Sequence, residues 1–156
     1  MGENREAQRI ADQFKRSFEG PAWHGPALME LLRKIPVDVA PAKPLEHAHS
    51  IWEIVLHIRA WQDAVLARLN GGRANLTAAQ DWPEVADYSE AAWRQTLAEL
   101  EASYKKLHAA IAATGDQRLD EILDDKDYSV YVLLHGVVQH DLYHAGQIAV
   151  LMKSSR

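Results

Sequence analysis

Apolar side chains recur every three or four residues in four long segments, which is the periodicity of the buried face of an α-helix. The expected helices span about residues 3–18, 50–70, 89–113 and 129–153. A shorter apolar stripe over residues 26–35 predicts one more helical piece. Proline, glycine and aspartate separate these segments, and no stretch alternates apolar and polar residues as a half-buried strand would. The pattern predicts an all-α bundle of four long helices.

The second long helix has the clearest start signal. Ser50 and Glu53 have the spacing of a capping box, in which each side chain satisfies a backbone N–H at the helix start. The apolar stripe that follows includes Ile54 and Trp61 and defines the inward face. Trp52 falls outside that stripe, so we expect it to face outward, where an exposed aromatic side chain would suit a dimer contact.

Composition narrows the class of protein. The 156 residues suit one domain spanning 1–156, with 47% apolar and 25% charged residues as in ordinary globular proteins. The net charge is −5 and no basic cluster interrupts it, which disfavours binding to nucleic acid or an anionic membrane. No apolar run is long enough to span a membrane. Cysteine is absent, which excludes disulfides and zinc–sulfur sites and agrees with a cytoplasmic location.

Two histidines stand one helical turn apart in the last long helix. Because His140 and His144 are four residues apart, their side chains share one face, the spacing by which a helix offers two imidazoles to one metal ion. Val137 and Ile148 lie on the same side, so that face points into the core. Neutral imidazoles in an apolar stripe need partners for their ring nitrogens.

A third inward-facing histidine lies on the second long helix. His57 is adjacent to Ile58 and lies between Ile54 and Trp61 on the inward stripe. Backbone carbonyls within helices are already hydrogen-bonded, so one shared cation would satisfy three rings at once. The alternative is that the three histidines are structural, with each ring hydrogen-bonded to backbone carbonyls.

The other histidines are weaker candidates. His49, just before the second long helix, is kept as a spare ligand. His24 lies in a connection between helices and either contacts a substrate at a pocket mouth or is only a turn residue. His108 and His135 are predicted to face away from the site.

Four polar residues lie close to the three histidines in sequence. Glu53, one turn before His57, is a possible hydrogen-bond acceptor for an imidazole, a fourth ligand, or only the capping partner. Tyr143 either lines a pocket as a proton donor or serves packing, and Gln147 is expected to hydrogen-bond across helices. Asp141 points about 100° away from His140, so it is a poor candidate for a general base.

These motifs resemble those of the DinB-like superfamily, also called the YfiT-like metal-dependent hydrolases. The resemblance rests on the segments 50–58 and 140–148, the second of which reads His-Asp-Leu-Tyr-His-Ala-Gly-Gln-Ile. It implies an up-down-down-up four-helix bundle, with long crossovers expected at residues 36–49 and 113–128. It also implies a metal between the second and fourth helices, held by one histidine of the former and two of the latter.

Relatives of this type are often homodimers, and some are transferases that use low-molecular-weight thiols. One is an isomerase whose thiol cofactor binds at the metal, but its additional C-terminal domain has no counterpart here, so its activity is not transferred.

Three neutral histidines would leave coordination positions open, as in catalytic metal sites. Zinc and nickel are the favoured divalent metals, although cobalt and ferrous iron also accept imidazole. The ion would supply either a hydroxide for hydrolysis or a site for a substrate thiolate, which must come from a small molecule because the chain has no cysteine. We therefore expect an enzyme that acts on a small molecule by thiol transfer or hydrolysis. The alternative is a noncatalytic, dimeric metal-binding or stress-related bundle, which predicts a site without a pocket.

Overall fold

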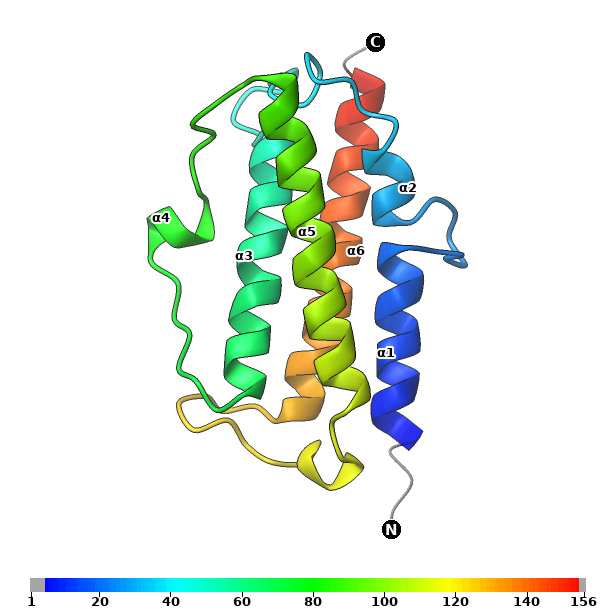
Figure 1. Cartoon of the computed structure of the whole chain (residues 1–156), viewed down its shortest axis with the longest axis vertical. Helices are drawn as coiled ribbons and strands as arrows, with labels where there is room; N and C mark the ends of the chain where they lie inside the picture. The colour runs from blue at the N-terminus through cyan, green and yellow to red at the C-terminus, as the bar shows by residue number, and fades with distance from the viewer. Residues whose placement is uncertain (1–4, 155–156) are drawn as a thin grey trace.

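The structure is a computed structural model that describes residues 5–154. Its four long helices are α1 (Arg5–Phe18), α3 (Ile51–Leu69), α5 (Glu90–Ala112) and α6 (Val130–Ser154). The short elements are α2 (Leu28–Leu32), α4 (Ala78–Asp81) and a 3-10 helix, η1 (Asp116–Arg118). No strand forms within residues 5–154, so the all-α prediction is confirmed (Figure 1).

The expected helix ends agree closely with the structure. The capping box at the start of α3 forms as predicted, because the hydroxyl of Ser50 accepts the N–H of Glu53 and the Glu53 carboxylate accepts the N–H of Ser50. The expected start of the first helix at Glu3 lies outside the described residues. The pattern predicted neither α4 nor η1, since each is too short to show a helical period.

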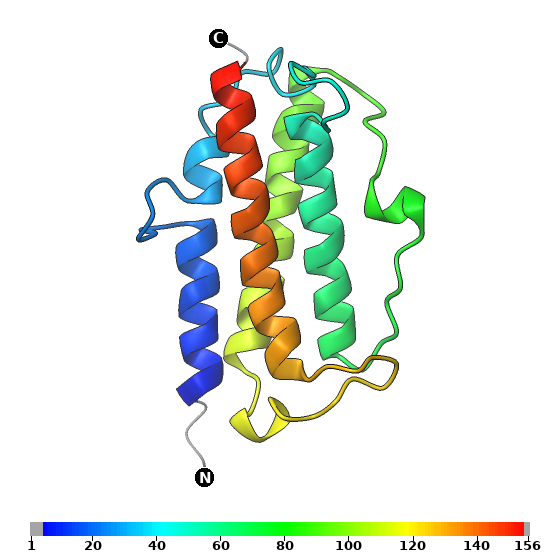
Figure 2. The ribbon, with the colours of Figure 1, turned by 180° about the vertical axis from the view of Figure 1, so that it is seen from behind.

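The four long helices lie side by side (Figures 1 and 2). Viewed as in Figure 1, α1 and α6 run from bottom to top, whereas α3 and α5 run from top to bottom. Helix α3 packs against α5 and α6, and α1 packs against the same two helices. The antiparallel pair α3 and α6 is the pair that carries the three candidate histidines.

The connection between α3 and α5 is the long crossover. Because these helices run in the same direction, residues 70–89 return along the length of α3 and carry α4 on the way (Figure 1). The expected crossovers at residues 36–49 and 113–128 are wrong. Each of those loops stays at one end of the molecule, because it joins helices that end and begin at that same end.

Trp52 is buried, which contradicts the outward orientation expected from the stripe. Its side chain is 2% exposed, its Nε1 donates to Oγ1 of Thr96 at 3.1 Å, and its ring packs against Trp93. The reason is that α3 packs on one side against α5 and on another against α6, so two of its faces are covered. Trp52 is therefore a core residue of the α3–α5 interface, and the predicted dimer contact through it is wrong.

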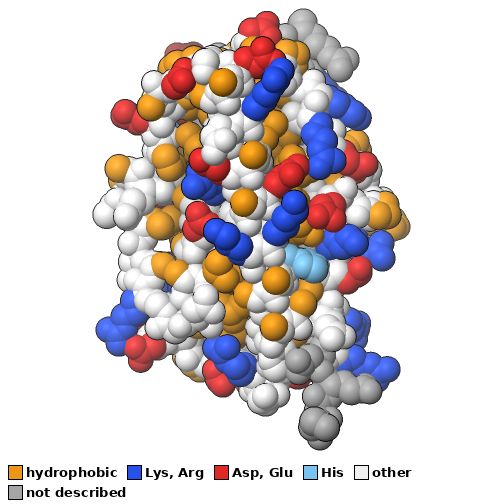
Figure 3. Space-filling model, in the orientation of Figure 1, with side chains coloured by type: hydrophobic (Ala, Val, Ile, Leu, Met, Phe, Trp, Pro, Cys, Tyr) orange, Lys and Arg blue, Asp and Glu red, His pale blue; other side chains and the backbone are white. Residues whose placement is uncertain are grey.

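The surface carries both signs of charge. On the face in Figure 3, Lys and Arg side chains alternate with Asp and Glu side chains. Among the described residues, oppositely charged side chains form ion pairs, such as Arg33 with Glu101 at 3.0 Å. None of the described helices combines the length and the apolar character needed to cross a membrane.

Candidate metal centre

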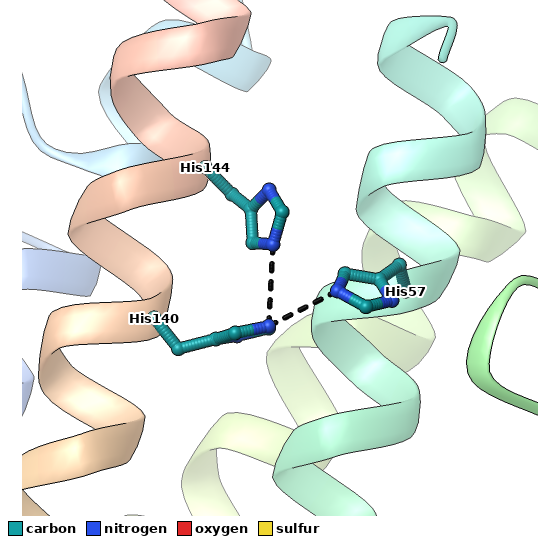
Figure 4. Close-up of side chains that lie close together, drawn as sticks. All are labelled: His57, His140 and His144. Atoms are coloured by element: carbon teal, nitrogen blue, oxygen red, sulfur yellow. Dashed lines mark hydrogen bonds between the residues drawn. The ribbon is translucent and has the colours of Figure 1, made fainter. Parts of the chain in front are cut away.

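Three imidazoles from α3 and α6 meet between the two helices. The Nε2 atom of His140 lies 3.0 Å from Nε2 of His57 and 3.2 Å from Nε2 of His144 (Figure 4). The potential ligand atoms of all three residues lie within 4.8 Å of one another. His57 and His144 are buried and His140 is half-buried. The three histidines therefore lie close together, as expected, and their role as metal ligands stays a prediction.

Acceptors on the far side of two rings fix where the ring protons lie. Nδ1 of His57 donates to the backbone carbonyl of Asp81 at 2.7 Å, and Nδ1 of His144 donates to Oε1 of Gln147 at 2.6 Å. A neutral imidazole with its proton on Nδ1 has a lone pair on Nε2. Both lone pairs therefore point toward Nε2 of His140.

With both outer ring protons on Nδ1, the three inner Nε2 atoms have too few protons to form a hydrogen bond at each of their two contacts. Nε2 of His140 has at most one proton, so it can satisfy His57 or His144 but not both. The other pair of nitrogens would then face each other with no hydrogen between them, which is costly in a buried site. A cation among the three atoms removes this conflict. Metal–imidazole bonds of about 2.0–2.1 Å place neighbouring ligand nitrogens roughly 3.0–3.4 Å apart, so the residues fit such an ion.

Burial keeps two of the rings neutral. Burial, together with the neighbouring His140, lowers the pKa of His144 to about 4, although the hydrogen bond to Gln147 partly opposes this shift. Burial also lowers the pKa of His57, against the opposing effect of the Asp81 carbonyl. Neutral imidazole is the form that binds metals, so both histidines are in the binding form near neutral pH.

A buried carboxyl group lies behind His140. Asp141 is fully buried, its Oδ2 accepts from Nε2 of Gln62 at 2.8 Å, and burial raises its pKa. Its Oδ1 lies 3.9 Å from Nδ1 of His140, too far for a hydrogen bond, and both atoms lack a partner in the described structure. As predicted, Asp141 points away from the helix face that carries His140 and His144. It is directed toward α3, where it contacts Gln62, and not toward solvent.

The crossover covers one side of the centre. The ring of Trp82 is stacked between two imidazoles, with centroids 3.8 Å from His57 and 3.6 Å from His49. Oδ1 of Asp81 lies 3.1 Å from Nδ1 of His57 and accepts the indole N–H of Trp61 at 2.6 Å. Sequence reasoning missed Asp81 and Trp82. A large aromatic residue within an otherwise polar connection is the signal that could have drawn attention to them.

The remaining candidates near the start of α3 lie outside the cluster. The Trp82 ring separates His49 from His57, so the spare-ligand role finds no support in the geometry. The Glu53 carboxylate is engaged in the capping box and in an ion pair with Lys43 at 2.8 Å. It also lies 3.4 Å from Nδ1 of His49. Of the three roles considered for Glu53, its contacts are those of a capping residue.

Three further site candidates are two residues of α6 and one in the connection between α1 and α2. Gln147 hydrogen-bonds to His144 of its own helix, so the expected bond across helices is wrong. Tyr143 is 66% exposed and its ring centroid lies 5.1 Å from that of His144. His24 is exposed and lines a separate cavity of about 480 Å³ with Leu142.

Two cavities border the cluster. One of about 530 Å³ lies beside His144 and is lined in part by His49, Trp82 and Tyr143. The other, of about 260 Å³, lies beside His140 and is lined mainly by apolar atoms. Cavities therefore adjoin the cluster on two sides. The larger has a volume typical of ligand pockets, and the smaller lies just below that range.

An all-α protein with three converging imidazoles between two of its long helices has the features of a helical metal-binding protein. The sequence model of the DinB superfamily matches residues 22–148. This match spans more than half of the chain, which therefore belongs to the DinB superfamily, whose proteins bind metal. Neither the curated proteins nor the solved structures gave a match.

Proposed function

We propose that this protein is a metal-dependent enzyme that acts on a small molecule by thiol transfer or hydrolysis. His57, His140 and His144 would hold one divalent ion, with zinc and nickel the favoured metals because they accept neutral imidazole. The observation that carries the proposal is the convergence of three Nε2 atoms, two of which are held as lone-pair donors by acceptors on the opposite ring nitrogen.

We also infer the DinB-like up-down-down-up bundle from the directions of the four long helices. Two helices run each way in Figure 1, and the single long crossover joins the two that run down. This connectivity brings α3 and α6 together antiparallel. His57 of α3 then faces His140 and His144 of α6 (Figure 4).

Three histidine ligands would leave coordination positions of the ion open for a reacting molecule. Within residues 5–154, the cluster contains three histidines and no carboxylate. When bound, a divalent ion would supply a Lewis acid that lowers the pKa of a bound water or of a substrate thiol. A reacting thiol would come from a low-molecular-weight compound, because the chain contains no cysteine.

The surrounding residues orient and shield the site. The Asp81 carbonyl and Gln147 hold protons on the outer ring nitrogens and so keep the inner lone pairs available. Trp82 lies flat on one face of His57 and excludes water there. Tyr143 lines the larger cavity and is partly exposed, so its hydroxyl is available to a molecule that enters.

The cavities support the enzyme over the noncatalytic alternative. A storage or structural centre needs no adjoining space, whereas this centre has a cavity beside His144 and another beside His140. Homodimerisation and a cytoplasmic location remain proposals that rest on the sequence alone.

Metal content tests the proposal. Untagged wild-type protein should retain about one divalent ion per chain, measured by inductively coupled plasma mass spectrometry, whereas His57→Ala and His144→Ala should retain little. His24→Ala is the matched control, because this exposed histidine lies outside the cluster. Equal and low metal content in all four proteins would refute the site.

Cobalt substitution then tests whether the centre is open. The absorption spectrum of the cobalt-loaded protein should shift when a small thiol is added at low concentration. A spectrum that does not respond to thiols would favour the noncatalytic alternative.

A further inference from the structure

A buried arginine lies three turns beyond His57 on the same face of α3. Arg68 is 7% exposed, so most of the residue is removed from solvent. Eleven residues correspond to about three helical turns, which brings Arg68 to the side of the helix that carries His57 and Trp61.

The hydrogen bonds of Arg68 are all to neutral oxygens. Its Nε and Nη2 donate to the carbonyl of Ala74, at 3.0 and 2.6 Å, and its Nη1 donates to the hydroxyl of Tyr128 at 3.1 Å. A guanidinium has five N–H groups, so these bonds leave about one free on each terminal nitrogen. Arginine engages a carboxylate through two parallel hydrogen bonds when two such N–H groups lie side by side.

No negative charge balances this cation. Among residues 5–154, Arg59 pairs with Glu99 and Arg73 pairs with Asp124, but no carboxylate forms an ion pair with Arg68. Burying a charge without an opposite partner is costly, so an anionic ligand at this position would be favoured by the cation.

Arg68 also lines the cavity beside the histidine cluster. That cavity, of about 260 Å³, is walled mainly by apolar side chains such as Val65 and Leu133 and reaches His140. The guanidinium carbon lies 5.4 Å from the centre of the Trp61 ring, and the Trp61 ring lies 5.9 Å from that of His140. Trp61 therefore forms a continuous wall from the cation to the cluster.

We propose that this cavity binds the carboxylate end of a small apolar or aromatic acid, with Arg68 as the anion-binding residue. The rest of the molecule lies along Trp61, and its far end faces the histidine cluster. That orientation rests on the proposed function, but binding of the acid at Arg68 does not. The size of the cavity and the two free N–H groups suit one carboxylate on a small body rather than a polyanion.

Ligand-observed ¹⁹F NMR tests the proposal, with 4-fluorobenzoate as the acid and 4-fluorobenzamide as its neutral isostere. The protein is used as purified and again after chelation, so that a missing metal does not obscure the result. Wild-type protein should bind the acid at least about tenfold more tightly than the amide, the difference expected of a charge-assisted bidentate contact. Equal binding of the two probes would overturn the proposal.

Variants locate the binding site. Arg68→Gln should reduce binding of the acid to that of the amide, whereas Arg73→Gln, which alters an exposed arginine, should change neither. If the acid keeps its preference in folded Arg68→Gln but loses it in His57→Ala, the carboxylate binds at the histidines and the proposal is wrong.

A second variant tests the proposal if Arg68→Gln does not fold. Val132 lines the same cavity and is 51% exposed, so Val132→Glu can supply an internal carboxylate to Arg68 without disturbing the core. This variant should lose binding of the acid. Tyr131→Glu, at a similarly exposed position on α6 that lines neither cavity beside the cluster, should retain it. Retained binding in Val132→Glu would contradict the proposal.

Discussion

The indole ring of Trp82 lies flat against the imidazole of His57, with 3.8 Å between the ring centroids and 6° between the ring planes. Trp82 belongs to the crossover that joins two parallel helices, so the connectivity of the bundle places an aromatic cover over the candidate metal centre. The adjacent Asp81 supplies the carbonyl that holds the proton on Nδ1 of His57. The crossover is therefore part of the site as well as a connection.

Removal of the Trp82 ring should destabilise the packing of the crossover against the candidate metal centre. We expect Trp82→Ala to lower the free energy of unfolding by about 2 kcal/mol, less than the 3–5 kcal/mol typical of a fully buried aromatic residue, because Trp82 is half-buried. Urea denaturation measures this change. Trp82→Phe keeps an aromatic ring at the position and should retain most of the stability. Unchanged stability in Trp82→Ala would show that the crossover is held by other contacts.

Gln147 should control metal affinity without contacting the ion. Its Oε1 holds the proton on Nδ1 of His144, and loss of such outer partners typically weakens metal binding about 10–100-fold. We expect this loss for Gln147→Leu in a competition titration with a chromophoric chelator. Gln139→Leu, at an exposed position of the same helix, is the matched control and should bind as wild type does. Equal affinity of the two variants would refute the role of Gln147.

The metal-free protein should lose stability as the pH falls from about 6.5 to about 4. The pKa of His144 is near 6.5 in the unfolded chain and is lowered to about 4 in the folded protein. Between these values the unfolded state binds more protons, so stability rises with pH by at most about 1.4 kcal/mol per pH unit for this group. Urea denaturation at several pH values should show this slope, and His144→Ala should reduce it. The same slope in both proteins would contradict the assignment.

The buried pair of Gln62 and Asp141 should be sensitive to loss of one partner. Gln62→Leu removes the only hydrogen bond given to the Asp141 carboxyl in the described structure and leaves that group buried. We expect a loss of about 1–3 kcal/mol in the free energy of unfolding. Gln95→Leu, on the exposed face of α5, should change stability by less than about 0.5 kcal/mol. Similar losses in the two variants would refute a special role for the buried pair.

Helical periodicity in the sequence was enough to predict the four long helices and the inward faces that carry His57 on one helix and His140 with His144 on another. These features depend on local spacing, since residues one turn apart share a face whatever the rest of the chain does. The capping box at Ser50 was predictable for the same reason.

The crossover and its contacts could not be predicted in this way. Asp81 reaches His57 because α3 and α5 run parallel, a long-range feature that no local spacing shows. The burial of Trp52 likewise depends on α3 having a second neighbour, α5, on the side that the apolar stripe did not identify. The prediction that Gln147 lies near the site agrees with its contact to His144. Its hydrogen-bond partner is on the same helix because side chains three residues apart on a helix are adjacent.

X-ray absorption spectroscopy of the metal-loaded protein tests the central claim most directly. We predict three imidazole nitrogen ligands at about 2.0–2.1 Å from zinc, and a decrease to two in His140→Ala. A shell that contains only oxygen ligands, or one that is identical in wild type and His140→Ala, would contradict the account.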